Sequence, residues 1–274
     1  MTTPAIPRNV LPSVRFRRRI AFFTACAIGL TAFLAYLRID PLSFIRDFHF
    51  VVDLAREMIP PNFKLLWVKQ GIWTSLLQTL AVAFLGTVVG AFAAIVLALL
   101  AAGNTSPSRY LRLLVRVLLA AERCTPNIVV LLVLLIAVGI GPFAAMLSLC
   151  IGSIGMFGKL FSDAIENVDH LPGEAIAAVG AGRLQVIRYA ILPQVAPSIA
   201  ANIFYAFDVN LRLAVALGVF GGGGIGFELH VARSVLRYRD MLACLILIMV
   251  LINLTERVAD AWRRRLFVND AELR

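Results

Sequence analysis

Uncharged apolar runs that are long enough to cross a lipid bilayer constrain this chain more than any other feature. Residues 20–37 form an uncharged run of 18, bounded by Arg19 and Arg38. At about 1.5 Å per residue, a helix of that length crosses most of a hydrocarbon core about 30 Å thick. Of the 274 residues, 60% are hydrophobic and only 15% are charged. The chain is therefore expected to be a membrane protein.

Further apolar runs predict a polytopic helical bundle. The predicted spans are residues 20–37, 72–101, 113–138, 142–161, 193–220 and 241–262. We expect an all-α fold with six transmembrane helices, and an even number of spans places both termini on one side of the membrane. The segments assigned to the inner side carry about twice as many lysines and arginines as the outer segments. This bias predicts cytoplasmic termini. It also explains the formal charge of +10 without a nucleic-acid partner.

Composition divides the chain into four parts. We expect a basic cytoplasmic tail over residues 1–19 and an additional N-terminal transmembrane helix with its outer connection over residues 20–71. A membrane core follows over residues 72–266, and residues 267–274 are expected to form a cytoplasmic C-terminal tail.

No pattern in the chain points to catalysis or to metal binding. The four cysteines lack ligand spacing, and the three histidines lie far apart in the sequence. A nucleophile elbow and a Walker lysine motif are both missing from the sequence. We therefore expect no catalytic residues, no metal and no cofactor in this chain.

A half-polar segment, residues 173–192, separates the fourth and fifth predicted spans. Pro172 suits the first turn of a helix, and Glu174 lies near the positive end of the helix dipole. Gly180 and Gly182 have no side chain, so another protein's backbone could approach closely, although Gly182 could equally end the helix. The remaining small residues that keep this helix thin are Ala175, Ala177, Ala178 and Ala181.

The second half of the segment predicts another short helix. Residues 183–192 have apolar side chains at helical spacing, and Pro193 is expected to begin the next span. From periodicity alone, a helix that merely lies on the inner membrane surface explains the segment as well as a docking helix does.

The segment resembles the EAA signature of the membrane subunits of binding-protein-dependent ABC importers. Ile176 departs from that signature, which has alanine at this position. The resemblance implies a cytoplasmic coupling helix that docks into a groove of an ATP-hydrolysing subunit. The residues that would couple to the ATPase are Glu174, Ala175, Ala178, Gly180, Ala181, Leu192 and Pro193.

The resemblance covers about residues 55–266 and becomes closer in one subfamily. The motifs GMFGKLFSDAIENVD and VFGGGGIGFEL are similar to those of phosphonate importer permeases. This implies a type I ABC importer permease core over residues 72–266 that forms the translocation path. Methionine importer permeases share some of these motifs, and selectivity in the family resides largely in the binding protein. Phosphonate is preferred, but phosphite, a phosphate ester and methionine stay open as substrates.

The resemblance also implies a set of partners. Two copies of an ABC ATPase subunit, a second permease subunit that is identical or paralogous, and an extracytoplasmic substrate-binding protein would complete the transporter in membrane lipid of the bacterial plasma (inner) membrane. ATP and Mg would be bound by the ATPase partner, and the permease itself would hydrolyse nothing.

A glycine-rich loop follows the fifth predicted span. Its backbone N–H groups could bind an anion, but no strand precedes it and no GK[ST] element follows it. We prefer a structural turn to direct ligand contact. The glycines of this outer loop are Gly221, Gly222, Gly223, Gly224 and Gly226.

Polar residues inside the predicted spans are costly, about 2.5 to 3.5 kcal/mol for a charge at mid-membrane. Asp208 and Arg212 are four residues apart and share a helical face, whereas Asn210 points elsewhere. An internal ion pair is the preferred interpretation, and a weak contact of Arg212 with a transported oxyanion is the alternative. Thr125 and Pro126 are expected to kink the third span. The candidate pathway or intramembrane polar residues are Asn202, Tyr205, Asp208, Asn210, Arg212 and Arg123.

Two other classes of membrane protein compete with this interpretation. An ion-driven secondary transporter would show internal repeats, and an intramembrane enzyme would show a positioned nucleophile and base. Neither signal is found in the sequence.

Overall fold

The computed structural model describes residues 14–37, 46–65 and 71–272, and every regular element in these ranges is helical. The chain divides into two compact units between Arg56 and Glu57. The first unit holds α1 (Val14–Tyr36) and most of α3 (Phe48–Met58). Residues 1–13 of the expected basic tail and residues 273–274 of the expected C-terminal tail lie outside the described residues.

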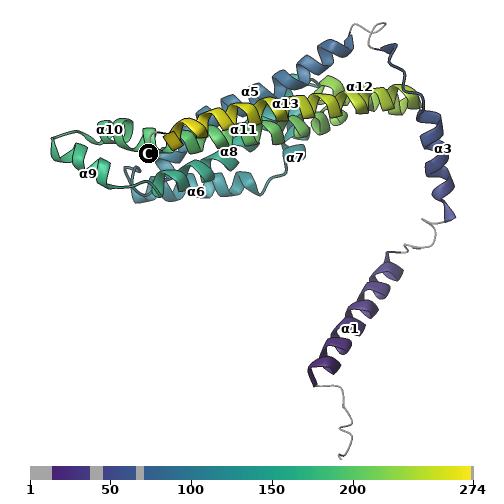
Figure 1. The fold of residues 1–274 in the computed structure, drawn as a ribbon, viewed down its shortest axis with the longest axis horizontal. Coiled ribbons are helices and arrows are strands. Elements are labelled where there is room, and N and C mark those ends of the chain that lie inside the picture. The colour runs from purple at the N-terminus through teal and green to yellow at the C-terminus, as the bar shows by residue number, and fades with distance from the viewer. Residues whose placement is uncertain (1–13, 38–45, 66–70, 273–274) are drawn as a thin grey trace, which may run out of the picture. The chain divides into compact units, whose positions relative to one another are not determined.

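The second unit is a long bundle with short helices at both ends. Figure 1 shows α5, α8, α11 and α13 side by side, with α9 and α10 at one end of the bundle and α12 toward the other. Five helices of the described residues are long and apolar enough to span a membrane, or six if one bent pair is a single span. The all-α membrane fold is confirmed. The elements of the second unit are α5 (Gly71–Ala101), α6 (Arg109–Arg123), α7 (Asn127–Val138), α8 (Pro142–Glu166), α9 (Leu171–Ala178), α10 (Arg183–Val186), the π-helical turn η1 (Ile187–Ile191), α11 (Leu192–Leu217), the π-helical turn η2 (Gly218–Gly222), α12 (Gly224–Ser234) and α13 (Tyr238–Glu272).

Close packing of α5 on α8 depends on two glycines of α5 that are four residues apart. A Cβ atom at Gly90 would lie 2.5 Å from the Cβ of Ser153, and one at Gly86 would lie 2.8 Å from the Cβ of Leu149. The GxxxG spacing puts both glycines on the same face of α5, as in many membrane helix pairs. Lipid tails are as apolar as the helices, so the hydrophobic effect does not drive helix association within the membrane. Van der Waals packing at this close contact stabilises the pair instead.

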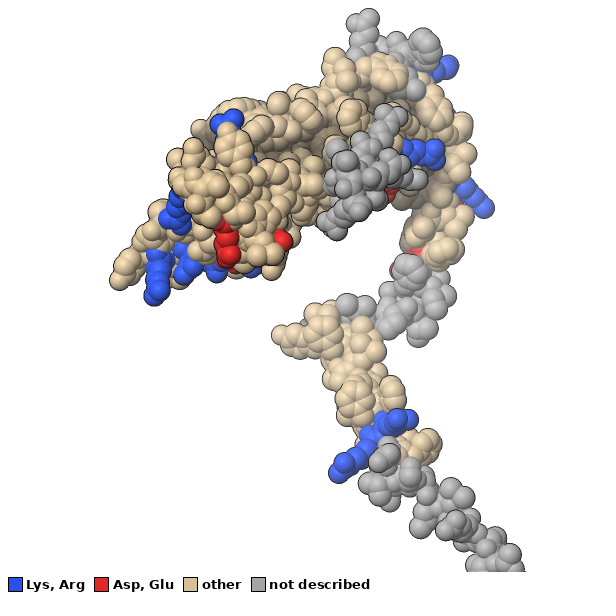
Figure 2. All heavy atoms as spheres, turned by 60° about the vertical axis from the view of Figure 1, so that its left-hand side comes forward, with Lys and Arg blue, Asp and Glu red and all other residues tan. Residues whose placement is uncertain are grey.

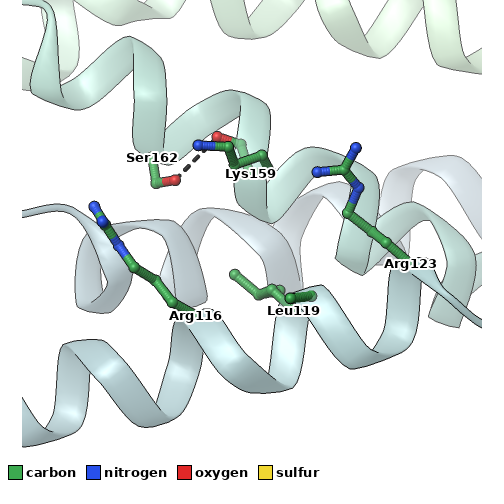
Figure 3. A pocket seen from close by; sticks show the side chains of 6 residues that line it. Arg116, Leu119, Arg123, Lys159 and Ser162 are labelled. Atoms are coloured by element: carbon green, nitrogen blue, oxygen red, sulfur yellow. Dashed lines mark hydrogen bonds between the residues drawn. The ribbon is translucent and has the colours of Figure 1, made fainter.

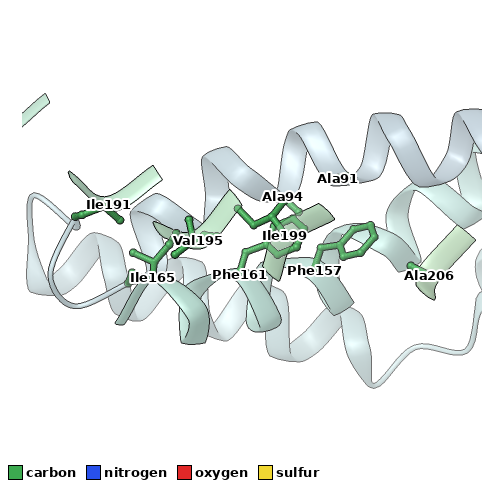
Figure 4. Close-up of a cluster of buried hydrophobic side chains, with 11 residues drawn as sticks. Ala91, Ala94, Phe157, Phe161, Ile165, Ile191, Val195, Ile199 and Ala206 are labelled. Carbon is green, nitrogen blue, oxygen red and sulfur yellow. The ribbon is translucent and has the colours of Figure 1, made fainter. Parts of the chain in front are cut away.

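An apolar core fills the space where α5, α8 and α11 meet (Figure 4). Alanines at helical spacing give α5 a flat face, against which Phe157 and Phe161 of α8 pack. The two rings are stacked, with centroids 4.9 Å apart and planes 13° from parallel. Ile191, Val195 and Ile199 close the core from the third side. This packing positions the short helices at the end of the bundle.

The third predicted span is broken rather than merely kinked. α6 and α7 are bent by 91° at a break over residues 124–126. Pro126 precedes α7, where its missing N–H does no harm. The hydroxyl of Ser148 on α8 donates a hydrogen bond of 2.7 Å to the carbonyl of Asn127 and holds the break in place. The chain changes direction at Thr125 and Pro126 as expected, but through a 91° break between two helices and not through a kink within one.

The fifth predicted span begins earlier than expected. Residues 183–217 are helical without a break through α10, η1 and α11, so the segment before Pro193 is not a separate short helix. Pro193 has no N–H to donate to the turn before it, and the π-helical turn η1 accommodates its ring without ending the helix. At the other end of the chain, α13 continues to Glu272 through most of the expected C-terminal tail.

Candidate functional site

The segment that resembles the EAA signature forms a helical hairpin, residues 169–194, at one end of the bundle (Figure 1). Its first helix, α9, carries Pro172 and Glu174 in the first turn, as expected. Gly180 has φ +93°, a left-handed conformation that glycine adopts without steric cost. The N–H of Gly180 donates to Ala177 at 3.0 Å, and that of Ala181 donates to Ile176 at 3.4 Å. This pair of bonds is a Schellman motif, so Gly180 rather than Gly182 ends the helix.

Gly182 instead begins the returning helix. Its carbonyl accepts the N–H of Gln185 at 2.9 Å and that of Val186 at 3.1 Å. The side-chain oxygen of Gln185 reaches back to accept the N–H of Gly182 at 2.7 Å. A glutamine at this position satisfies a backbone donor that the helix leaves free. The hairpin tip is thus a tight turn built from backbone geometry.

The base of the hairpin is fixed by one glutamine of α11. Gln194 accepts the N–H of Asp169 at 3.1 Å and donates to its carbonyl at 3.3 Å. The carboxylate of Asp169 in turn accepts the N–H of Leu171 at the start of α9. Inside the hairpin, Gly173 leaves room for Val186, whose Cγ1 would lie 3.4 Å from a Cβ at that glycine. Both arms of the hairpin are therefore held against the start of the fifth span.

A chain of hydrogen bonds links the hairpin to α8. Arg183 donates from Nη2 to the carbonyl of Ser106 at 2.6 Å. That loop, residues 102–108, is tied to the end of α8 by the Glu166 carboxylate, which accepts the N–H of Gly103 and a hydrogen bond from Arg116. A displacement of the hairpin would therefore reach α8 through polar contacts of fixed geometry.

The hairpin exposes apolar side chains beside the charged side chains of Glu174, Arg183 and Arg188. Val179 is 86% exposed, Leu184 is 81% exposed and Leu171 is 70% exposed. Figure 2 shows lysine and arginine side chains gathered at this end of the body, beside a smaller acidic patch. Of the residues expected to couple to an ATPase, Ala181 and Leu192 are half-buried, and the exposed ones are Glu174, Ala175, Ala178, Gly180 and Pro193.

The charged residues of the fifth span form an ion-pair network. Arg212 lies 3.0 Å from the Asp208 carboxylate and 3.8 Å from that of Glu256 on α13. The second oxygen of Asp208, Oδ1, is buried without a hydrogen-bond partner. The expected pair of Asp208 with Arg212 is present, and Glu256 extends it to a second helix.

The other polar candidates of this span do not gather on one surface. Asn210 is buried and donates hydrogen bonds of 2.8 Å to Thr87 on α5 and to Ser153 on α8. Asn202 bonds the carbonyl of Ser198 on its own helix, and Tyr205 is 54% exposed. Asn210 therefore joins three helices, while Tyr205 and Arg212 face outward.

The glycine-rich loop has a structural explanation for its composition. Gly221, Gly223 and Gly224 have φ values of +105°, +76° and +69°. A Cβ at Gly226 would lie 2.0 Å from the carbonyl oxygen of Val215, and one at Gly222 would lie 2.8 Å from the Cβ of Ala145.

Polar side chains of α5 accept the first N–H groups of α12, where this loop ends. Gln78 accepts the N–H of Gly224 at 3.0 Å, and the hydroxyl of Thr79 accepts that of Ile225 at 2.9 Å. These two donors are not available to an anion. In the part of the chain that the structure describes, no group of three or more His, Cys, Asp or Glu residues could hold a metal ion.

Several partners of these sites have no short-range signal in the sequence. Glu256, Gln194 and Ser106 reach the residues they bond only through the fold. The GxxxG spacing of Gly86 and Gly90 is a local signal, and it marks the face of α5 that packs on α8.

Comparisons with known proteins agree on one family. The family described as "Binding-protein-dependent transport system inner membrane component" matches residues 94–268. The phosphite transport system permease protein PtxC of Stutzerimonas stutzeri is 34% identical over 228 residues, which cover 82% of this chain and 81% of PtxC. The phosphate-import permease protein PhnE of Mycolicibacterium smegmatis is 34% identical over 268 residues, which cover 96% of this chain but 50% of that relative.

Solved structures show the same fold at lower identity. An inward-facing structure of the MetNI methionine ABC transporter matches with a TM-score of 0.61 at 21% identity, over 75% of this chain and 99% of its own. A bacterial ABC transporter involved in the import of alginate matches with a TM-score of 0.64 at 16% identity, over 92% of this chain and 99% of its own. At these identities the similarity concerns the fold alone.

Proposed function

Because the chain belongs to the family of binding-protein-dependent transport system inner membrane components, we propose that it carries a phosphorus oxyanion across the membrane and couples to an ATPase through the hairpin of residues 169–194. Family membership makes the chain a non-catalytic, multi-pass inner-membrane permease of an ABC importer. Such a permease works with an ATPase and a binding protein.

The substrate class is supported by several relatives that are 34% or 35% identical to the chain. The phosphite permease PtxC and the phosphate-import permease PhnE are each 34% identical to the chain, and a putative phosphite permease, HtxC of Stutzerimonas stutzeri, is 35% identical over 207 residues. A probable D-methionine permease of Vibrio cholerae is 29% identical over 48% of this chain. Phosphite, phosphonate or phosphate is therefore proposed ahead of methionine.

The coupling role is supported by the surface of the hairpin. The exposed apolar side chains of Leu171, Val179 and Leu184 have no packing function within the chain, because each is at least 70% exposed. A rigid tip with small side chains suits insertion into a groove of another protein. We propose that each of two ATPase copies binds ATP and Mg and receives one such hairpin from a pair of permeases, which are identical or paralogous. Cytoplasmic placement of the hairpin and of both termini belongs to the same proposal.

ATP-driven uptake by the reconstituted transporter tests the substrate. The permease, co-purified with the ATPase and binding protein of its own host, would be placed in liposomes and supplied with labelled phosphite, methylphosphonate, phosphate or methionine. We expect uptake of at least one phosphorus oxyanion that needs ATP and the binding protein. Uptake of methionine alone, or uptake driven by an ion gradient without ATP, would refute the proposal.

A matched pair of variants tests the coupling surface. Val179→Asp adds a charge at the exposed tip, whereas Val179→Thr keeps the shape of the side chain. We expect the Asp variant to lose the ATPase in a detergent pull-down and the Thr variant to retain it, with equal amounts of both permeases in the membrane. Equal recovery of the ATPase with both variants would remove the hairpin tip from the interface.

A further inference from the structure

A cationic pocket lies between α6 and α8, and its lining shares no residue with the hairpin or with the ion pairs of the fifth span. Its volume is about 230 Å³. Figure 3 shows Arg116 and Arg123 on α6 toward the two ends of the pocket, with Lys159 of α8 between them. The lining residues are Arg116, Leu119, Ala120, Arg123, Lys159 and Ser162.

The pocket exists because a glycine of α8 admits a leucine of α6. A Cβ at Gly158 would lie 2.5 Å from the Cδ2 of Leu119, so the leucine side chain occupies the space that a larger residue would fill. Leu119 is 5% exposed and lines the pocket. Arg116 and Arg123 are seven residues apart, about two helical turns, so both rise from the same face of α6.

The positive charge of the pocket is only partly compensated. Arg116 pairs with Glu166, and Lys159 lies 2.6 Å from the Asp163 carboxylate. Among the described residues, no carboxylate lies within ion-pair distance of Arg123. Its neighbour Glu122 turns toward α8, where its buried Oε2 occupies the space beside Gly155. Arg123 therefore makes no ion-pair contact among the described residues, although the neighbouring Glu122 carboxylate interacts with it electrostatically.

Arg123 is the last residue of α6, about 20 Å along the helix from Arg109 at the rise of an α-helix. It falls within the third predicted span, and an ionisable residue in a transmembrane segment lines a wet cavity or pairs with another polar group as a rule. A guanidinium presents paired donors that match the oxygens of a phosphate group.

We propose that this pocket binds the oxygens of a phosphate-type group, with Arg123 as the principal donor and Lys159 and Arg116 contributing positive charge. The Ser162 hydroxyl, which donates to the Lys159 carbonyl at 2.9 Å, can rotate to donate to the same ligand. Two sources share this chemistry, the transported oxyanion and the headgroup of an anionic phospholipid. The first source rests on the proposed function, and the second does not.

Binding to the permease–ATPase complex in nanodiscs separates the two sources. With ADP saturating the ATPase, radiolabelled inorganic phosphate would be added to complexes in phosphatidylcholine, with phosphite as competitor. Complexes in phosphatidylglycerol would be examined by native mass spectrometry for retained lipid. Arg123→Gln removes the guanidinium, and Ala120→Glu adds a carboxylate to the exposed rim without touching the core. Arg109→Gln, an equal loss of charge on the same helix but outside the pocket, is the matched control.

We expect both pocket variants to lower retention of one ligand at least tenfold and the control to leave it unchanged. Loss of bound phosphate identifies the transported oxyanion, and loss of bound phosphatidylglycerol identifies the lipid. Retention of both ligands by both pocket variants would overturn the proposal. Uptake assays on the wild type test the proposed function separately from this result. A transporter specific for methionine would refute the proposed function, and the lipid measurement would then decide whether the pocket binds a phosphate-type group.

Discussion

Asn210 on α11 and Thr87 on α5 share a buried hydrogen bond of 2.8 Å in the interior of the bundle. The same amide nitrogen lies 2.8 Å from the hydroxyl oxygen of Ser153 on α8, so one side chain joins three helices. Thr87 also donates to the carbonyl of Ala83 on its own helix. Asn210, Thr87 and Ser153 are all buried, which makes these bonds a source of specific helix register.

The first prediction concerns this buried amide. Asn210→Leu should destabilise the folded permease by about 1 to 3 kcal/mol, because membrane hydrogen bonds contribute about 0.6 to 1.7 kcal/mol each and Leu must also fit the space. The measurement is the thermal unfolding midpoint in detergent. Asn253→Leu is the control, since Asn253 is exposed and bonds only the carbonyl of Met249 on its own helix. If both variants unfold at the same temperature, Asn210 does not hold the three helices together.

Local patterns in the sequence predicted the features that depend on neighbouring residues. Asp208 and Arg212 are four residues apart on one helix, and they pair because a helix brings such positions together. Pro126 marked the break between α6 and α7 because it cannot continue a hydrogen-bonded helix. The angle of 91° could not be predicted, because contacts with α8, including the Ser148 bond to the Asn127 carbonyl, set it.

The candidate sites were predicted less completely, since their partners are distant in the chain. The hydrogen bond from Arg183 to the carbonyl of Ser106, 77 residues away in the sequence, was not predicted. Asn210 was grouped with Arg212 as a pathway residue, yet it is buried on another face of the helix. The direction of a polar side chain in a membrane bundle depends on which helices surround it, and one sequence does not contain that arrangement.

A second prediction uses the close contact of α5 with α8. Gly90→Ala would place a Cβ 2.5 Å from that of Ser153 and 2.9 Å from the carbonyl oxygen of Cys150. Backbone and Cβ atoms cannot move aside cheaply, so we expect a loss of about 1 to 3 kcal/mol of stability. Gly71→Ala on the same helix is the control, because its Cβ would have no neighbour within 4 Å. Differential scanning fluorimetry of both variants in detergent provides the comparison, and a Gly90→Ala protein as stable as the control would contradict the packing argument.

A third prediction separates the structural role of Asp208 and Arg212 from a pathway role. Arg212→Gln leaves the partly buried Asp208 carboxylate without its closest cation. We expect this single change to lower the free energy of unfolding by about 1 to 3 kcal/mol. Adding Asp208→Asn should restore part of that free energy in the double variant. Unfolding in detergent measures stability, and uptake per folded transporter measures transport. A double variant with recovered stability and normal uptake indicates an ion pair alone.

The opposite outcome supports contact with the transported anion. In that case the double variant would be stable but would lose uptake, because transport would need the positive charge of Arg212 and not only its pairing with Asp208. The exposed pair of Asp53 and Arg56 on α3, 3.6 Å apart, is the control for the cycle. Its coupling should be close to zero, as exposed pairs contribute little.

A fourth prediction concerns the left-handed residue at the hairpin tip. Gly180→Ala should destabilise the conformation of the hairpin tip by about 1 to 2 kcal/mol, because a Cβ is disfavoured at φ +93°. Gly180→Asn should cost less, since asparagine tolerates this conformation, and no neighbour lies within 4 Å of the added Cβ in either case. We expect the Ala variant to bind the ATPase about fivefold to thirtyfold more weakly than the wild type and the Asn variant to bind nearly as well. A larger effect of Asn than of Ala would mean that bulk at the interface, and not turn geometry, requires glycine.

The last prediction tests the connection between the hairpin and the loop of residues 102–108. Arg183→Ala removes the hydrogen bond of 2.6 Å to the Ser106 carbonyl and should loosen that loop by about 1 kcal/mol. We expect amide hydrogens of the loop to exchange about fivefold faster in hydrogen–deuterium exchange, a factor that corresponds to about 1 kcal/mol. Arg188→Ala is the control, because Arg188 lies over the Tyr189 ring at 5.6 Å on the same hairpin. If the Arg183 variant still hydrolyses ATP but takes up less substrate, the bond transmits motion from the hairpin to the bundle. If neither the amide exchange of the loop nor the uptake changes, the hairpin and the loop move independently.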